Sequence, residues 1–266
     1  MPSYTSFPRP PYVPLPSPAP DFVPQVTTLL HVDVNRTDTG APCHGSICRP
    51  YRELSAAWAH AARVATEVNR VAVMLWPGRH HLAALELTPY VDLYGMTPNT
   101  AYLDLDGEVV APTSMNLGGA TLANLLVTCS SVDPGAAALR VKHRGNVFLQ
   151  NVYIFSSARG IVLEGDSVAC AVFLGVSSLL DAVRLQGTSF MSFEHCVLGS
   201  NGPPYFDLAV EAGAAAYMDN YTWFQNQTLS IAGTTGSIGN LPGPVGLADG
   251  SYHLAVAGGA ASWVAD

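Results

Sequence analysis

The tripeptide Leu139-Arg140-Val141 is the first of five similar segments, and each segment is followed within four residues by a glycine. The other four are Ile161-Val162-Leu163, Val183-Arg184-Leu185, Leu208-Ala209-Val210 and Leu229-Ser230-Ile231. Successive segments start 22, 22, 25 and 21 residues apart. A period of this length, made of strand-like rather than helical segments, is typical of a β-solenoid.

The alternation within each segment predicts which side chains face the core. In a strand, the first and third residues point to one side and the middle residue points to the other. The flanking residues are apolar, whereas the middle residues include Arg140 and Arg184, which we therefore place on the outside. The glycine that follows suits a tight corner with an unusual backbone conformation.

A second apolar series lies between the repeats and predicts a further strand in each coil. Its inward candidates are Leu149, Phe173, Phe193 and Met218, followed by Val152, Val176, Cys196 and Tyr221. Between these two sets, one column reads Asn151, Gly175, His195 and Asn220, with Asn124 as a candidate first member. Asparagines there could hydrogen-bond along the stack, or could simply be turn formers. Either interpretation predicts a corner at this column.

Each coil is therefore expected to hold two or three short strands that pair in parallel with the next coil. One coil cannot bury its own apolar face, but stacked coils share a continuous core. An antiparallel sandwich would also contain many short strands. The nearly constant period favours the solenoid.

The region before the repeats predicts one helix, over residues 51–68. Its apolar positions fall at helical spacing, and they are Leu54, Trp58, Ala61, Ala62 and Ala65. Strands are expected at 26–34, 71–76, 80–87 and 90–94, with a Gly/Pro/Cys loop at 35–50.

Three stretches of this region, "PYRELSAAWAHAA", "VAVMLWPGRHHLAALEL" and "TPYVDLYG", carry a family resemblance. Together they resemble the opening of pectin-lyase-like right-handed parallel β-helices, in which a helix caps the end of the solenoid. The resemblance implies an all-β fold, a right-handed parallel β-helix with an N-terminal capping α-helix. Such solenoids occur in pectinases, adhesins, and viral tail spikes, fibres and capsid-associated proteins.

We divide the chain into four parts by composition. Residues 1–24 form an extended Pro-rich arm, 25–96 the first strand, capping helix and first coils, 97–233 the parallel β-helix, and 234–266 a Gly/Pro-rich cap. The arm favours polyproline II and cannot pack a core. We expect it to anchor the protein in a groove on a partner. Its contact residues would be Pro8, Pro10, Pro11, Tyr12, Pro14, Pro16 and Phe22.

The composition limits the kinds of partner. Only 12% of the residues are charged, against roughly 25% in an average protein. This low fraction suggests that copies of the chain or partners cover part of its surface. The net charge is −8 with no basic stripe, which argues against nucleic-acid binding. No apolar run is long enough to span a membrane, and no secretory signal is evident, so we expect synthesis in a host cytoplasm.

No pattern of catalytic residues emerges, and no cofactor is expected. The acidic residues Glu164, Asp166, Asp181 and Glu194 are scattered along the chain, as polar faces and turns would require. Lys142-His143-Arg144 reads as a solvated strand end, and His80-His81 is not a convincing ligand pair. Cys43 and Cys48 flank His44 in a loop, where a disulfide or an incomplete zinc site could form. The other cysteines, Cys129, Cys170 and Cys196, are expected to fill the core.

Aromatic residues near the last coils are the remaining sign of a binding surface. Tyr205, Tyr221 and Trp223 could contact a glycan or another subunit, or could fill the C-terminal core. We therefore predict a non-enzymatic structural virion protein on the particle surface: a capsid decoration, head spike or tail fibre. It would be a homotrimer, held by its arm on another virion protein, and could attach to a host glycan. The competing prediction is a carbohydrate-active β-helix enzyme, a polysaccharide lyase or hydrolase.

Overall fold

The computed structural model describes residues 26–37, 45–113, 119–218, 222–226, 228–231, 252–257 and 260–265. Several predicted features lie outside these residues: the arm at 1–24, Cys43, His44, Asn220 and Tyr221. The anchoring role of the arm, and the division of the chain into four parts, stay predictions.

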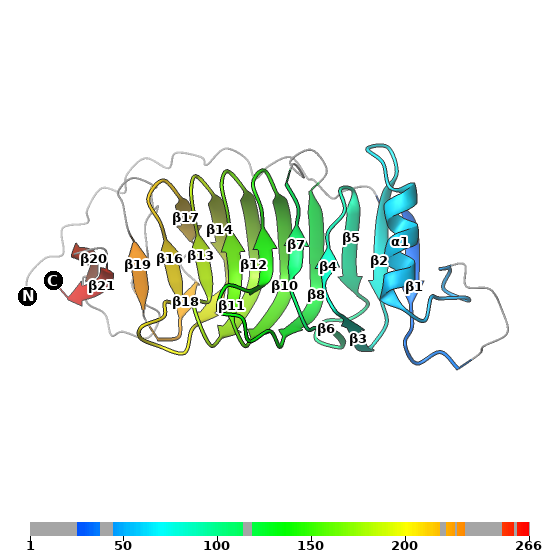
Figure 1. The fold of residues 1–266 in the computed structure, drawn as a ribbon, viewed down its shortest axis with the longest axis horizontal. Coiled ribbons are helices and arrows are strands. Elements are labelled where there is room, and N and C mark those ends of the chain that lie inside the picture. Colours follow the sequence, from blue (N-terminus) through cyan, green and yellow to red (C-terminus); the bar gives the residue numbers. More distant parts are fainter. Residues whose placement is uncertain are drawn as a thin grey trace, which may run out of the picture.

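The described residues form one helix and a series of short strands (Figure 1). The helix is α1 (Leu54–Val64). The first strands are β1 (Val26–Val32), β2 (Arg70–Leu75), β3 (Gly78–Leu82), β4 (Leu85–Glu86), β5 (Val91–Gly95), β6 (Ala101–Leu105), β7 (Val109–Ala111), β8 (Ala120–Cys129), β9 (Ala137–Val141) and β10 (Asn146–Ser156). The later strands are β11 (Arg159–Leu163), β12 (Val168–Ser178), β13 (Val183–Leu185), β14 (Phe190–Glu194), β15 (Val197–Gly199), β16 (Leu208–Val210), β17 (Ala215–Met218), β18 (Trp223–Phe224), β19 (Leu229–Ile231), β20 (Tyr252–Ala257) and β21 (Ala260–Ala265).

The five predicted repeats are the strands β9, β11, β13, β16 and β19, which lie side by side in one sheet (Figure 1). Their register is the predicted one: Leu139 is opposite Ile161, which is followed by Val183, Leu208 and Leu229. All of these pairs are parallel, so the antiparallel sandwich is excluded. We call this the repeat sheet; β7 and β4 extend it toward the N-terminus, and β20 and β21 close it by antiparallel pairing. The fold is a parallel β-helix, as predicted.

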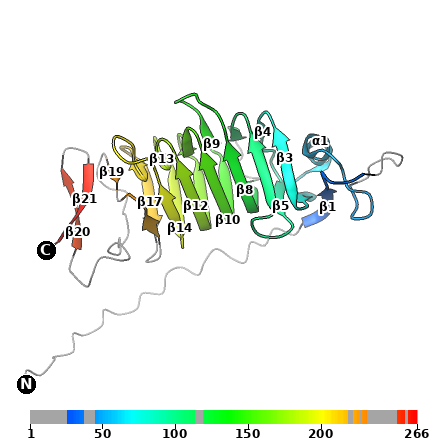
Figure 2. The same cartoon turned by 90° about the horizontal axis from the view of Figure 1, so that it is seen from below.

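The other strands form a 12-stranded sheet that bends at a corner; we call it the bent sheet. Its long strands β8, β10 and β12 lie side by side when the molecule is viewed from below (Figure 2). The corner residues Asn124, Asn151, Phe173 and His195 have positive φ angles of 57°, 52°, 56° and 55°. Each coil therefore has three sides: one in the repeat sheet, and one on either side of this corner.

The predicted corner column is right at Asn124, Asn151 and His195 and wrong at Gly175. Asn151 Nδ2 donates to Asn124 Oδ1 at 3.0 Å, so the asparagines do bond along the stack. In the next two coils, the rings of Phe173 and His195 lie 5.2 Å apart and replace that hydrogen bond. Gly175 instead lies two residues past the corner, where a Cβ atom would be 2.6 Å from the Tyr153 ring. A glycine is required there because the ring occupies the space.

The core follows the alternation that the sequence predicts, with one exception. Leu149, Val152, Val176, Phe193 and Cys196 are buried. Phe173 is not, because it occupies the corner, and 52% of its surface is exposed. Ala171 takes the inward position opposite Leu149 and Phe193. The sequence predicted that Phe173 faces the core because phenylalanine is usually buried, and its hydrophobicity does not distinguish an exposed corner position from a core position.

Helix α1 lies at the N-terminal end of the stack and packs against β1 and β2 (Figure 1). Of the predicted apolar positions, Leu54, Trp58 and Ala61 are buried, whereas Ala62 is exposed. The Trp58 indole Nε1 donates to the Glu86 carbonyl at 2.9 Å, which ties the helix to the first coil. The helix is shorter than predicted and ends at Val64, whose carbonyl accepts a hydrogen bond from Asn69 Nδ2.

The glycines after the repeats make a corner of their own. Gly165, Gly187 and Gly213 all have positive φ, at 65°, 69° and 89°. A Cβ atom on Gly187 would lie 3.0 Å from the Gly165 carbonyl oxygen, and one on Gly213 would lie 2.8 Å from that of Gly187. The predicted need for glycine is confirmed here by both backbone conformation and space. Gly145 differs, since in its coil Arg144 has the positive φ, at 58°.

Candidate functional surfaces

The outer side of the repeat sheet carries a network of ion pairs, which we call the charged face. Arg140 lies at its N-terminal part, and its guanidinium donates to Glu108 at 2.9 Å and also to Glu164. The side chains of Arg140 and Glu108 are only 16% and 20% exposed. The hydrogen bond with Glu108, and then that with Glu164, raise the pKa of Arg140 despite its burial.

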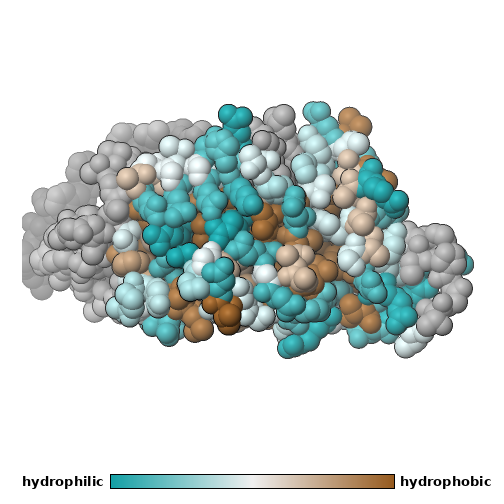
Figure 3. Space-filling view, in the orientation of Figure 1, coloured by the Kyte–Doolittle hydropathy of each residue, from teal (hydrophilic) through white to brown (hydrophobic). Residues whose placement is uncertain are grey.

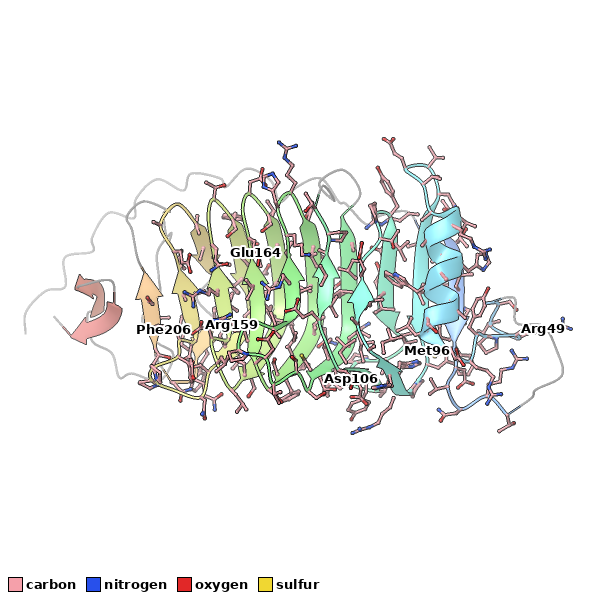
Figure 4. All side chains as sticks on the ribbon, in the orientation of Figure 1. Arg49, Met96, Asp106, Arg159, Glu164 and Phe206 are labelled. Carbon is pink, nitrogen blue, oxygen red and sulfur yellow. The ribbon has the colours of Figure 1, made fainter. Side chains whose placement is uncertain are left out.

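A second cluster on the charged face centres on Asp181. This carboxylate is 6% exposed and pairs with Arg184 at 2.9 Å and with Arg159 at 3.5 Å. Arg184 also pairs with Glu211 at 2.8 Å, and Gln186 donates to the same carboxylate at 3.0 Å. Residues from three successive coils thus meet in one network. In Figure 4, Arg159 and Glu164 lie on the side of the repeat sheet that faces the viewer.

The network shifts the ionisation of its members toward their charged forms. Burial raises the pKa of Glu211, but the hydrogen bonds from Gln186 and Arg184 outweigh it, and the pKa is lowered. Burial likewise lowers the pKa of Arg184, and its bonds with Glu211 and Asp181 raise it overall. Figure 3 shows the same face: hydrophilic residues gather over β11, β13 and β16. The arginines and carboxylates of the charged face are thus paired with one another in their charged forms.

Glu164 and Asp181 lie on a polar face, as the sequence predicts, but their ion pairs with Arg140 and Arg184 were not predicted. The two acidic residues are 17 residues apart in sequence, and the coiling brings both to one face because each lies at an end of a repeat-sheet strand. The sequence places Glu211 on the outer side of its repeat, but its ion pair with Arg184 was not predicted, and Glu108 was not singled out. The repeat period applied to charged residues could have found the Arg140–Glu164 and Arg184–Glu211 pairs, whereas Glu108 lies 32 residues before Arg140 and does not follow that period.

A different surface lies on the bent sheet, just past its corner, and we call it the apolar face. One outward row runs from Tyr102 through the strands of successive coils: Leu126, Tyr153, Gly175, Val197 and Trp223. Tyr153, Val197 and Trp223 are 39%, 48% and 49% exposed. Phe173, 52% exposed, stands at the corner beside this row. Three coils of this row thus carry a large exposed apolar side chain, and the coil between Tyr153 and Val197 carries Gly175.

The aromatic residues predicted for binding divide between surface and interior. Trp223 belongs to the apolar face, whereas its neighbour Phe224 is buried at 6% exposure. Tyr205 is half-buried in the loop between β15 and β16, and its amide donates to the Gly202 carbonyl at 3.0 Å. Tyr221 lies outside the described residues. The structure thus makes Trp223 part of an exposed row whose other members, Tyr153, Val197 and Phe173, the sequence did not suggest.

The basic and histidine motifs have structural positions. His143 and Arg144 lie at a turn and approach the Asp166 carboxylate at 2.6 and 3.6 Å. His80 is buried, its Nε2 is 2.9 Å from the Trp76 carbonyl oxygen, and burial lowers its pKa. His81 is exposed and lies 3.4 Å from Asp106. The two neighbouring histidines therefore point to opposite sides of β3.

Two of the three cysteines predicted for the core are buried there, Cys129 and Cys196, whereas Cys170 is half-buried on the outer side of β12. Cys48 is exposed, and the predicted disulfide or metal site with Cys43 stays a prediction. Among the described residues, no group of three or more His, Cys, Asp or Glu is placed to hold a metal ion. In the same residues, no helix is long and apolar enough to span a membrane.

An open groove of about 570 Å³ runs beside the apolar face. It follows the ends of β8, β10, β12 and β15 and the loops that leave them, and serines are its commonest lining residues. None of its lining residues is Asp, Glu, Lys, Arg or His. This groove was not predicted from the sequence.

Comparisons with known proteins assign no family to the chain. No protein-family model and no curated protein matches the chain. Among solved structures, pectin methylesterase PemA from Erwinia chrysanthemi is similar, with a TM-score of 0.43 and 12% identity over 80% of this chain and 67% of that one. The strand pairing itself gives the chain the parallel β-helix architecture that the sequence predicts.

Proposed function

We propose that the protein is a structural subunit of a larger particle, a virion, and that it associates with further copies of itself through the apolar face. The observation that carries the proposal is the row of exposed apolar side chains Tyr153, Val197 and Trp223, in which Gly175 takes the place between Tyr153 and Val197 and Phe173 stands beside it. Isolated apolar side chains on a surface are ordinary, but a contiguous row of them is typical of an interaction site.

The charge distribution supports an assembling rather than a freely soluble chain. Only 12% of the residues are charged, and on the charged face each arginine is paired with carboxylates of this chain. Closed symmetric assembly would bury the same apolar row on every copy. The virion setting rests on the predicted Pro-rich arm and on the resemblance to solenoids of tail spikes and fibres.

The mass of the protein in solution tests the assembly. We expect full-length protein to have about three times the chain mass of 28.0 kDa in light scattering. Val197→Asp places a charge in the apolar face and is expected to shift the mass to that of the monomer. The matched control is Val68→Asp, at a valine 87% exposed in the turn after α1, which should leave the mass unchanged. A wild-type monomer at working concentrations would contradict the proposal.

The virion role needs a separate experiment, because a trimer could serve elsewhere. Deleting residues 1–24 should leave the trimer intact and abolish incorporation into particles when the protein is supplied to the assembling virus. Unchanged incorporation would refute the anchoring role, and absence of the full-length protein from purified particles would refute the setting.

A carbohydrate-active enzyme is the second candidate, and one observation favours it. Asp181, Arg184 and Glu211 come together from successive coils on the charged face, as side chains of a polysaccharide site would. The arginines already occupy these carboxylates, which makes this candidate the weaker. Release of reducing ends or unsaturated products from a panel of polysaccharides, lost in Asp181→Asn, would establish it in place of the first.

A further inference from the structure

The groove beside the apolar face has its own chemistry. Phe155, Ser177 and Gln225 lie along it in register with Thr128 and Gly199, one residue from each successive coil. Neighbouring coils are about 4.8 Å apart, so the four steps from Thr128 to Gln225 span roughly 19 Å. The groove is therefore elongated along the axis of the solenoid.

The inner serines of the groove serve the fold. Ser156 Oγ accepts from the Ala158 amide at 3.1 Å, and Ser178 Oγ donates to the Leu180 carbonyl at 2.9 Å. Ser200 Oγ donates to Asp207 at 2.9 Å. These three side chains come from consecutive coils and hold the turns that follow β10, β12 and β15. Their hydroxyl groups are therefore already hydrogen-bonded within the chain.

The outer polar groups have no such role. Ser157, Ser177, Asn201 and Gln225 line the groove, are exposed, and make no side-chain hydrogen bond with any described residue. Hydroxyl and amide groups of this kind both donate and accept hydrogen bonds. They stand where a ligand lying in the groove could bond to them.

Two apolar side chains complete the lining. Phe155 is 47% exposed and Leu179 is 52% exposed, although both border a polar groove. An exposed aromatic ring beside uncharged donors and acceptors matches a pyranose ring, which has an apolar C–H face and hydroxyl groups at its edge.

We propose that this groove binds a short oligosaccharide without charged groups, laid along the axis of the solenoid across the ends of β8, β10 and β12 and the residues that follow β15 and β18. The absence of Lys, Arg and His from the lining disfavours a glycan with carboxylate or sulfate groups, because such a ligand would lose its hydration without gaining a counter-charge. The groove adjoins the apolar face, but none of its lining residues belongs to the row of Tyr153, Val197 and Trp223.

Isothermal titration of the full-length protein with single hexasaccharides tests the site. The probes are maltohexaose, cellohexaose, mannohexaose and N-acetylchitohexaose, with hexagalacturonate as the acidic comparison. We expect at least one neutral hexasaccharide to bind and hexagalacturonate to bind at least tenfold more weakly. Phe155→Ala and Ser177→Val should each weaken binding of that neutral probe, Phe155→Ala by about fivefold, since a stacked aromatic ring contributes on the order of 1 kcal/mol.

Phe173→Ala is the matched control, at an exposed phenylalanine of β12 that does not line the groove. It should leave hexasaccharide affinity unchanged within about twofold while it lowers the mass in light scattering. The proposal is overturned if no neutral hexasaccharide binds, if hexagalacturonate binds as tightly as the best neutral probe, or if Phe155→Ala binds like wild type. Failure of assembly would leave these three outcomes unchanged, so the two proposals can fail separately.

Discussion

The charged face and the apolar face are built on the same coils by the same alternation, but only one of them is complete by itself. On the charged face, the outward Val162 is 2% exposed because the arginine side chains on either side cover it. On the apolar face, the outward Val197 is 48% exposed and nothing in the described chain covers it. Identical strand geometry therefore produces one surface that satisfies its own charges and one that leaves apolar area in water.

The difference shows what an outward position can mean in a solenoid. An outward residue that pairs with the coil above or below it stabilises the stack. An outward residue that finds no partner within the chain is available for another molecule. The two kinds can be separated by measuring stability and assembly on the same variants.

The largest expected loss of stability comes from Arg140→Ala on the charged face. This change leaves Glu108 and Glu164 half-buried without their counter-charge, and we expect a loss of about 2–3 kcal/mol in the free energy of unfolding. The measurement is urea unfolding at fixed protein concentration. Arg144→Ala, at an arginine 57% exposed near Asp166, is the control and should change stability by less than about 0.5 kcal/mol. Equal losses in both variants would mean that the buried ion pairs of Arg140 stabilise the fold no more than the exposed ion pair of Arg144 does.

A pair of valines gives the sharpest comparison of the two faces. Val162→Ala removes buried methyl groups and is expected to destabilise by about 1–2 kcal/mol. Val197→Ala removes exposed ones and should change the unfolding free energy by less than about 0.5 kcal/mol when measured at a concentration too low for assembly. The same Val197→Ala should weaken the assembly at higher concentration. If Val197→Ala destabilises the isolated chain as much as Val162→Ala, the apolar face belongs to the core.

Most of the fold could be predicted from the sequence, because a repeated apolar pattern also indicates which residues of successive strands lie opposite each other. The spacing of Leu139, Ile161 and Val183 predicted the parallel pairs that the structure has. The corner at Phe173 could not be predicted in this way, since a phenylalanine with positive φ has no sequence signal that distinguishes it from a core residue. The sequence therefore predicted Gly175 as the corner residue of this coil, two residues after the actual corner residue Phe173.

The surfaces were harder to predict than the core. Apolar alternation shows which side chains face outward, but it does not show which outward side chains meet across coils of unequal length. The distance from Arg184 to Glu211 is 27 residues in sequence, and from Arg140 to Glu164 it is 24. The groove depends on Ser157, Ser177 and Gln225 from three loops or strand ends, and no local motif connects them.

Salt should weaken the charged face and leave the association through the apolar face unchanged. Raising sodium chloride from 0.05 to 1 M screens the charged face and should reduce the stability difference between wild type and Arg140→Ala by about 0.5–1 kcal/mol. Apolar association is not weakened by this change, so the mass in light scattering should stay the same. Dissociation in high salt would show that ion pairs, rather than the apolar face, hold the copies together.

The smallest expected effect, and the most specific to the charged face, is the pH dependence of Glu211. Because its pKa is lower in the folded protein than the usual 4.5, its contribution to stability is complete above pH 4.5 and is lost as the pH falls through the folded value. Wild type should therefore exceed Glu211→Gln by about 0.5 kcal/mol at pH 7, since the carboxylate is 37% exposed, and by nothing at strongly acidic pH. Glu194→Gln, at a side chain 60% exposed outside the network, should match wild type at both pH values. If the difference for Glu211→Gln persists in acid, its origin is packing rather than charge, and the charged face is held together by shape more than by its ion pairs.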